Sequence, residues 1–191
     1  MGSFYTTIAV GSVQQEEIRA VVGERRAFMS PPAGGFTVLY PDQRLFLNPT
    51  EVMSLCSGLS ATVCGPVMMA MVHDDDIMYY WLWTEGALVD RYISDPSYYE
   101  PHPNGHQPYG GDALELCRVF DSYSPEALKR TLYTAHGQEN RYVFETDRHR
   151  DLVRLLGLPL FSAGIGFEYI EAGEVPEGLK LEQLGLMPEG M

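Results

Sequence analysis

The stretch VMMAMVHDDDIMYYWLW, residues 67–83, decides the fold. Two apolar runs, 67–72 and 77–83, stand on either side of one histidine and three aspartates. Each run has the length and the aromatic and apolar content of a buried strand, and the polar break between them has the length of a tight turn. The stretch therefore predicts a β-hairpin that is buried on both faces and carries three carboxylates at its tip.

The chain as a whole predicts an α+β fold with a mainly antiparallel sheet. Strands are expected at about 4–10, 27–29, 36–40, 67–73, 77–83 and 87–93. Helices are expected after the first and third strands, so the chain up to the fourth strand follows the order βαββαβ of the ferredoxin-like split βαβ unit. A hairpin extends this unit, and a helical C-terminal half is expected to pack on the sheet.

Two sequence patterns mark where the first helices begin. Ser12 followed by Gln15 matches a capping box and predicts a helix that ends at Gly23. Asn48-Pro49-Thr50-Glu51 supplies an N-cap, a proline at the first helical position and an early glutamate. The apolar residues of 52–63 then recur at helical spacing, so this is the stronger of the two helix predictions.

The length of the chain, 191 residues, is typical of a single domain with one substantial core. The predicted parts are a sheet-rich half, a loop rich in proline, tyrosine and histidine, a helix-rich half and a tail, at 1–94, 95–111, 112–170 and 171–191 of the single domain 1–191. Further short strands are predicted at 142–144 and 161–169. Within the second of these, Gly164 and Gly166 predict a bend where two backbones approach closely.

Charge and composition restrict the partners. The chain has 13 basic and 26 acidic side chains, and its net charge of −13 repels nucleic-acid phosphates and anionic membrane surfaces. No apolar run approaches the ~20 residues of a membrane helix, and no secretory signal pattern is present. Cys56, Cys64 and Cys117 form no Cys-x-x-Cys pair, so buried thiols are expected at the first and last of them. We expect a cytoplasmic protein with no nucleic-acid or membrane partner.

The acidic turn is a candidate metal site. Asp74, Asp75 and Asp76 could give oxygen ligands to Mg²⁺, Mn²⁺ or Ca²⁺, and His73 would add a ligand for a transition metal. However, neighbouring side chains at a hairpin tip point to alternate sides, and aspartate is also an ordinary turn residue. A solvated turn without metal is the competing interpretation. A divalent metal is the one cofactor that the sequence suggests.

A histidine in the helix-rich half is a second candidate for chemistry. His149 precedes Leu152, Val153 and Leu156 by three, four and seven residues, which places it on the apolar side of a helix. It is either a base held in a dry pocket or a core imidazole bonded to a backbone carbonyl. The second interpretation is preferred, because most buried polar groups are satisfied in this way.

The loop at 95–111 is the best candidate for binding. Its tyrosines have apolar bodies and polar tips, which is typical of recognition surfaces, and long loops on a rigid scaffold often bind ligands. The candidate binding residues are Tyr98, Tyr99, His102, His106 and Tyr109. The competing interpretation is a crossover whose tyrosines only cover the edge of the core.

Four segments resemble a family of uncharacterised bacterial proteins of similar length. They are Val72-His73-Asp74-Asp75-Asp76, Gly86-Ala87-Leu88-Val89-Asp90-Arg91-Tyr92, Gly110-Gly111-Asp112-Ala113 and Glu168-Tyr169-Ile170-Glu171-Ala172-Gly173-Glu174. The resemblance implies a bacterial, cytosolic, single-domain protein, and it implies no activity, cofactor or site residue.

Three functional hypotheses follow from these features. The leading one is a non-enzymatic protein that binds a partner protein or a small ligand through the loop and the neighbouring end of the sheet, because no catalytic constellation is assembled. The alternative is a metal-dependent hydrolase or phosphoesterase, with the three aspartates as ligands and His73 or His149 as base. The third is a homo-oligomer that buries the aromatic hairpin at its interface.

Overall fold

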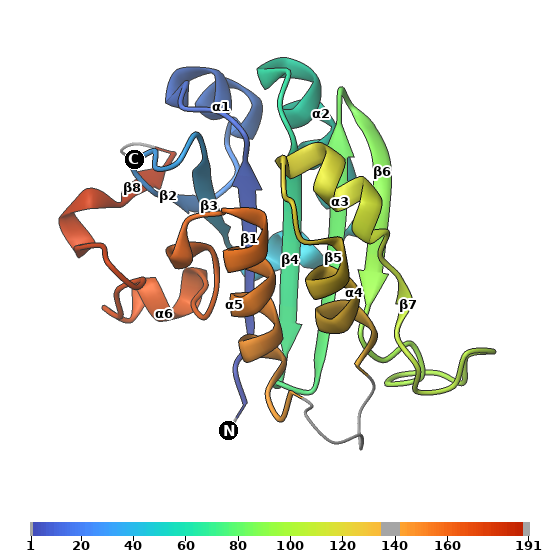
Figure 1. Ribbon diagram of the computed structural model, residues 1–191. Helices are drawn as coiled ribbons and strands as arrows, with labels where there is room; N and C mark the ends of the chain where they lie inside the picture. Colours follow the sequence, from blue (N-terminus) through green and yellow to red (C-terminus); the bar gives the residue numbers. More distant parts are fainter. Residues whose placement is uncertain (1, 135–141, 189–191) are drawn as a thin grey trace.

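The protein is built on one antiparallel sheet of eight strands (Figure 1). The computed structural model describes residues 2–134 and 142–188. Along the chain the strands are β1 (Tyr5–Val10), β2 (Ala27–Met29), β3 (Thr37–Pro41), β4 (Val67–His73), β5 (Ile77–Thr84), β6 (Ala87–Ile93), β7 (Tyr109–Gly110) and β8 (Gly185–Met187). Across the sheet their order is β7-β6-β5-β4-β1-β3-β2-β8, and each neighbouring pair is antiparallel. The predicted α+β class with a mainly antiparallel sheet is confirmed.

Helices cover the sheet on both faces. Two helices lie on one face, at the upper end of the sheet in Figure 1, and three lie across the other. The first set is α1 (Gln15–Val22) and α2 (Pro49–Val63), and the second is α3 (Ala113–Phe120), α4 (Pro125–Tyr133) and α5 (Glu145–Leu156). Shorter turns are α6 (Phe167–Glu171) and the 3₁₀ helices η1 (Gln43–Leu47), η2 (Leu160–Ser162) and η3 (Leu181–Gln183).

The central hairpin of β4 and β5 supplies both cores, as predicted from its sequence. Met68, Ala70 and Val72 alternate into the core beneath α3, α4 and α5, whereas Val67 and Met69 face α1 and α2. On the three-helix side Tyr80 of β5 stacks on Tyr92 of β6, with ring centroids 5.4 Å apart and planes 18° apart. The hairpin is thus buried on both faces over most of its length.

The acidic turn closes the hairpin with three residues, 74–76, between the paired residues His73 and Ile77. Asp74 and Asp75 have φ values of 56° and 58°, and the Asp76 amide donates to the His73 carbonyl at 3.1 Å. Two successive residues with positive φ make the connection tight. Aspartate tolerates this conformation better than most residues, which explains its use here.

The predicted capping interactions of the first two helices are wrong in detail. Helix α1 begins at Gln15 and not directly after Ser12. The Ser12 hydroxyl accepts a hydrogen bond from the Gln14 amide at 3.0 Å. The Gln15 side chain donates instead to the Ser30 carbonyl at 2.8 Å, so it ties the helix to the β2–β3 connection. Asn48 is at the N-cap of α2, but its side chain makes no capping hydrogen bond.

Two predicted strands are not strands. Residues 142–144 form a bend before α5, and 161–169 form η2 and α6. Gly164, with a φ of 95°, interrupts any extended run through the second segment. Gly166 does lie at a close backbone approach, as predicted, because a Cβ there would stand 2.8 Å from the Cβ of Tyr5. The tail returns to the sheet as β8, beside β2.

Candidate functional site

Helices α1 and α2 cover only one end of their face of the sheet. They pack on the start of β4 and the end of β5, at Val67, Met69 and Trp83. At the other end the side chains on the same face stay partly exposed, although they are large and mostly apolar. We call this end the aromatic face, and its strand residues are Phe4, Met71, His73, Tyr79, Trp81, Arg91, Ile93 and Tyr109.

The strand register places these side chains beside one another on the same face of neighbouring strands. Met71 faces Tyr79 across the β4–β5 pair, and Trp81 faces Arg91 across the β5–β6 pair. Directly opposed residues in an antiparallel pair have neighbouring side chains on the same face. Residues of β4 to β7 are therefore neighbours at the site although they are far apart in the sequence, because the sheet holds their strands side by side.

The loop at 95–111 folds over one margin of the aromatic face. The rings of Tyr98 and Tyr99 stand edge-on to that of His73, with centroids 5.9 and 5.6 Å away. His102 packs against Tyr109 at 5.2 Å. Two of the five predicted binding residues thus contact the histidine of the acidic turn, and two others, His102 and Tyr109, contact each other.

The fifth predicted residue, His106, stabilises the conformation of the loop and does not line a pocket on the aromatic face. Its Nδ1 lies 2.9 Å from one oxygen of Asp95 and 3.1 Å from the other. The same carboxylate accepts from the Ser97 amide at 3.0 Å, and the Ser97 hydroxyl accepts from the His102 amide at 3.1 Å. This chain of hydrogen bonds fixes the backbone of the loop at His102.

Two pockets open side by side on the aromatic face. The first has a volume of about 200 Å³ and lies between Phe4, Thr6, Gln43, Met71 and His73. The second has a volume of about 280 Å³ and lies between Tyr79, Trp81, Arg91, Pro96, His102 and Tyr109. Both pockets are small, lined mainly by apolar surface, and suited to one ring-sized group each.

The phenols of Tyr79 and Tyr99 stay protonated, because their pKa values are raised. Burial raises the pKa of Tyr79 well above its usual value, and the neighbouring Tyr99, Tyr98 and Asp95 raise it further. The pKa of Tyr99 is also raised by burial, and the two hydroxyls share a hydrogen bond. These groups can donate hydrogen bonds to a ligand, but they do not act as phenolate bases near neutral pH.

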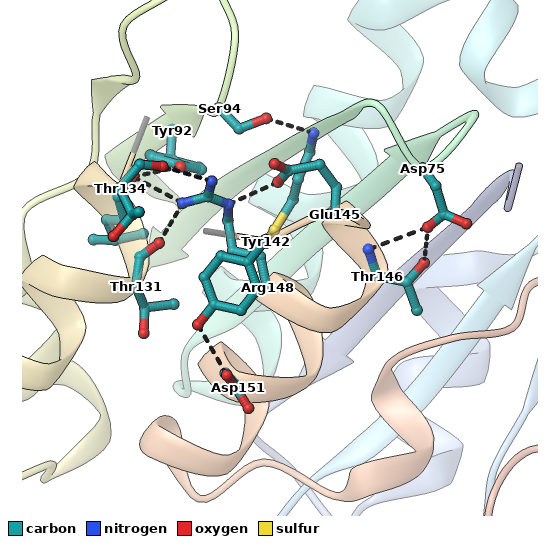
Figure 2. A network of polar contacts seen from close by, with 12 residues as sticks. Asp75, Tyr92, Ser94, Thr131, Thr134, Tyr142, Glu145, Thr146, Arg148 and Asp151 are labelled. Atoms are coloured by element: carbon teal, nitrogen blue, oxygen red, sulfur yellow. Dashed lines mark hydrogen bonds and ion pairs between the residues drawn. The ribbon is translucent and has the colours of Figure 1, made fainter. Parts of the chain in front are cut away.

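The carboxylates of the acidic turn point in different directions and bind different donors. Asp75 accepts from the Ser3 amide at 3.0 Å, and from both the amide and the hydroxyl of Thr146 at the start of α5 (Figure 2). Burial raises its pKa, but the hydrogen bonds from Thr146 and Ser3 outweigh burial and hold the pKa below its usual value. Asp75 therefore ties the N-terminal segment to α5.

The other two carboxylates of the turn also have protein partners. Asp74 accepts from the Gly2 amide at 3.1 Å, and Asp76 accepts from the Tyr98 hydroxyl at 3.4 Å. Within residues 2–134 and 142–188 no three histidine, cysteine, aspartate or glutamate side chains gather in a way that could hold a metal ion. The metal site at His73 and the three aspartates stays a prediction.

A buried ion pair near the turn has no counterpart in the sequence-based predictions. Arg148 donates through Nε to Glu145 at 2.7 Å, and both side chains are almost completely buried (Figure 2). Its remaining nitrogens donate to the carbonyls of Thr131, Leu132 and Thr134 at the end of α4. Those carbonyls have no partner within their own helix, so Arg148 joins α4 to α5. A Glu-x-x-Arg spacing is too common to reveal such a site.

The histidine of α5 also has a structural role. His149 is completely buried, and its Nδ1 lies 2.9 Å from the Tyr5 hydroxyl, not from a backbone carbonyl as predicted. Burial, with a smaller effect of Arg150, lowers its pKa to about 3. The imidazole is therefore neutral, and it accepts the hydrogen bond because burial keeps the Tyr5 phenol protonated.

Comparison with family models, curated proteins and solved structures gives no match for this chain. The resemblance to uncharacterised bacterial proteins stays a prediction. Among the described residues no helix is both long enough and apolar enough to span a membrane. Function is therefore inferred from the geometry of the aromatic face.

Proposed function

We propose that this protein is a non-enzymatic binding protein, and that it holds a small organic ligand with an aromatic ring at the aromatic face. The observation that carries the proposal is the row of partly exposed rings on a sheet end that α1 and α2 leave open. Concave pockets lined by aromatic side chains and a few polar groups are typical of small-ligand sites. A small ligand suits these two pockets better than a protein partner, which needs a broad surface of roughly 800 Å².

The roles of the titratable side chains nearby support binding over catalysis. Asp75 is occupied by Ser3 and Thr146, Asp95 is occupied by Ser97 and His106, and His149 is buried against Tyr5. A general base needs a free acceptor within reach of the substrate. These groups instead stabilise the loop and the hairpin that form the pocket walls.

We also infer that β1, α1, β2, β3, α2 and β4 form a ferredoxin-like split βαβ unit, which the β5–β6 hairpin extends. The strand order β4-β1-β3-β2 supports this inference, as does the shared core of α1 and α2 on one face. In this arrangement the two helices end before the sheet does, which leaves the aromatic face open beside the added hairpin.

The two tryptophans make the proposal easy to test. Trp81 lines the second pocket, whereas Trp83 is buried beneath α2. Titration with benzyl alcohol should change the fluorescence emission of Trp81 up to a saturating value. The Trp81→Phe variant lacks this contribution and therefore identifies it. Tyr109→Ala should weaken binding several-fold, because ring contacts contribute about 1 kcal/mol each.

Tyr123→Ala is the matched control for this titration, because Tyr123 is 94% exposed and lies between α3 and α4. It should leave binding unchanged. A Trp81 signal that never saturates, or one that Tyr109→Ala and Tyr123→Ala weaken equally, would contradict the proposed function.

A further inference from the structure

A single cation lies at the aromatic face, in the second pocket. Arg91 projects from β6 beside Trp81, because the two residues are opposed across the β5–β6 pair. Its side chain lines the pocket together with His102 and Tyr109. In the described part of the chain, the guanidinium of Arg91 makes no hydrogen bond or ion pair with another residue.

The neighbouring carboxylate does not neutralise this arginine. The side chain of Asp90 turns to the opposite face, where it accepts from the Tyr80 hydroxyl at 2.7 Å and from the Asp112 amide at 2.9 Å. The described residues that line the pocket include no aspartate or glutamate, although the whole chain has 26 of them. The pocket is therefore a cationic spot on an acidic protein.

The shape of the pocket restricts the ligand further. Its volume of about 280 Å³ holds one ring and a small substituent. Trp81 and Tyr109 offer ring faces and edges to a flat group, and the Arg91 guanidinium presents paired donors that match a carboxylate. An anionic group on the ring would thus meet the unpaired cation without displacing a protein partner.

We propose that the pocket between β5, β6, β7 and the 95–111 loop binds a planar aromatic carboxylate. The ring lies against Trp81 and Tyr109, and the carboxylate accepts hydrogen bonds from Arg91. This inference rests on the proposed function and narrows its ligand class.

The test compares benzoate with benzyl alcohol, which has a similar ring and no charge, by titration of Trp81 emission. Benzoate should bind about tenfold more tightly, because its carboxylate accepts charge-assisted hydrogen bonds from Arg91 and part of this gain is lost to solvent. Arg91→Gln should remove that tenfold advantage and leave the affinity for benzyl alcohol unchanged. The preference for benzoate should also shrink as salt is raised, because the pocket is open to solvent.

Arg154→Gln is the matched control, because Arg154 is an exposed arginine on α5, which packs on the opposite face of the sheet, and is paired with Asp151. It should change neither affinity. Equal affinities for benzoate and benzyl alcohol would overturn the carboxylate inference and leave the proposed function standing. A benzoate advantage that survives Arg91→Gln would overturn it too, and failure of both probes to bind would overturn both proposals.

Discussion

At the scale of single residues, the molecule uses buried polar groups to join segments rather than to react. Arg148 links α5 to the last carbonyls of α4, and Asp75 links the hairpin tip to Ser3 and Thr146. A buried charge is tolerated only when it is paired and fully hydrogen-bonded. Arg148 meets this requirement through Glu145 and the α4 carbonyls, and the partly buried Asp75 carboxylate is held by neutral donors from Ser3 and Thr146.

His149 gives the protein a specific sensitivity to acid. Its pKa is about 3 in the folded state and near 6.5 when unfolded, so between these values only the unfolded chain takes up the proton. The free energy of unfolding should therefore fall with falling pH across this window, by about 1.4 kcal/mol per pH unit from this group. Urea unfolding of His149→Gln, which keeps an acceptor for Tyr5, should show a shallower slope than the wild type.

The control for this experiment is Tyr123→Ala, because Tyr123 lies in the turn between α3 and α4 and its side chain is 94% exposed. Its slope should be close to that of the wild type over the same window. Parallel slopes for the wild type and His149→Gln would contradict the neutral, buried state of His149.

At the scale of elements, the short strand β8 closes the β2 edge of the sheet. Met187 points into the core with α1 and α2, whereas its neighbour Leu186 is 40% exposed. Met187→Ala should lower the free energy of unfolding by about 2 kcal/mol, the lower end for a buried methionine, because a three-residue edge strand can adjust. Leu186→Ala is the matched control and should cost less than about 0.5 kcal/mol in the same denaturation experiment. Similar losses for both variants would contradict this assignment of faces.

The elements also explain how far the sequence could predict the site. The hairpin and its turn were predictable, because apolar runs and a polar break are local signals. The tyrosines of the 95–111 loop could also be predicted as binding residues, because their clustering in one segment is a local signal. Tyr79, Trp81 and Arg91 were missed, since a strand pattern does not tell where the covering helix ends. The prediction of a strand at 161–169 was wrong, because Gly164 interrupts an otherwise apolar run.

At the scale of the whole molecule, the two helical layers share one sheet. Strands β1, β4 and β5 send alternate side chains into both cores, so neither layer keeps its core without the other. We expect one cooperative unfolding unit. In native-state hydrogen exchange, the slowest amides of α2 and α5 should report the same opening free energy, within about 0.5 kcal/mol. A clearly lower value for α5 would mean that its layer opens alone.

The stacked pair Tyr80 and Tyr92 has an optical consequence. Trp81 and Trp83, two residues apart on β5, form a second close pair, with ring centroids 6.1 Å apart and nearly perpendicular planes. Rings held this near in fixed, chiral orientations couple their electronic transitions and add paired bands of opposite sign to the circular dichroism spectrum. These bands overlap the peptide bands from which helix content is calculated. The spectrum of this protein should therefore misstate its helix content, and it should instead follow the integrity of β5 directly.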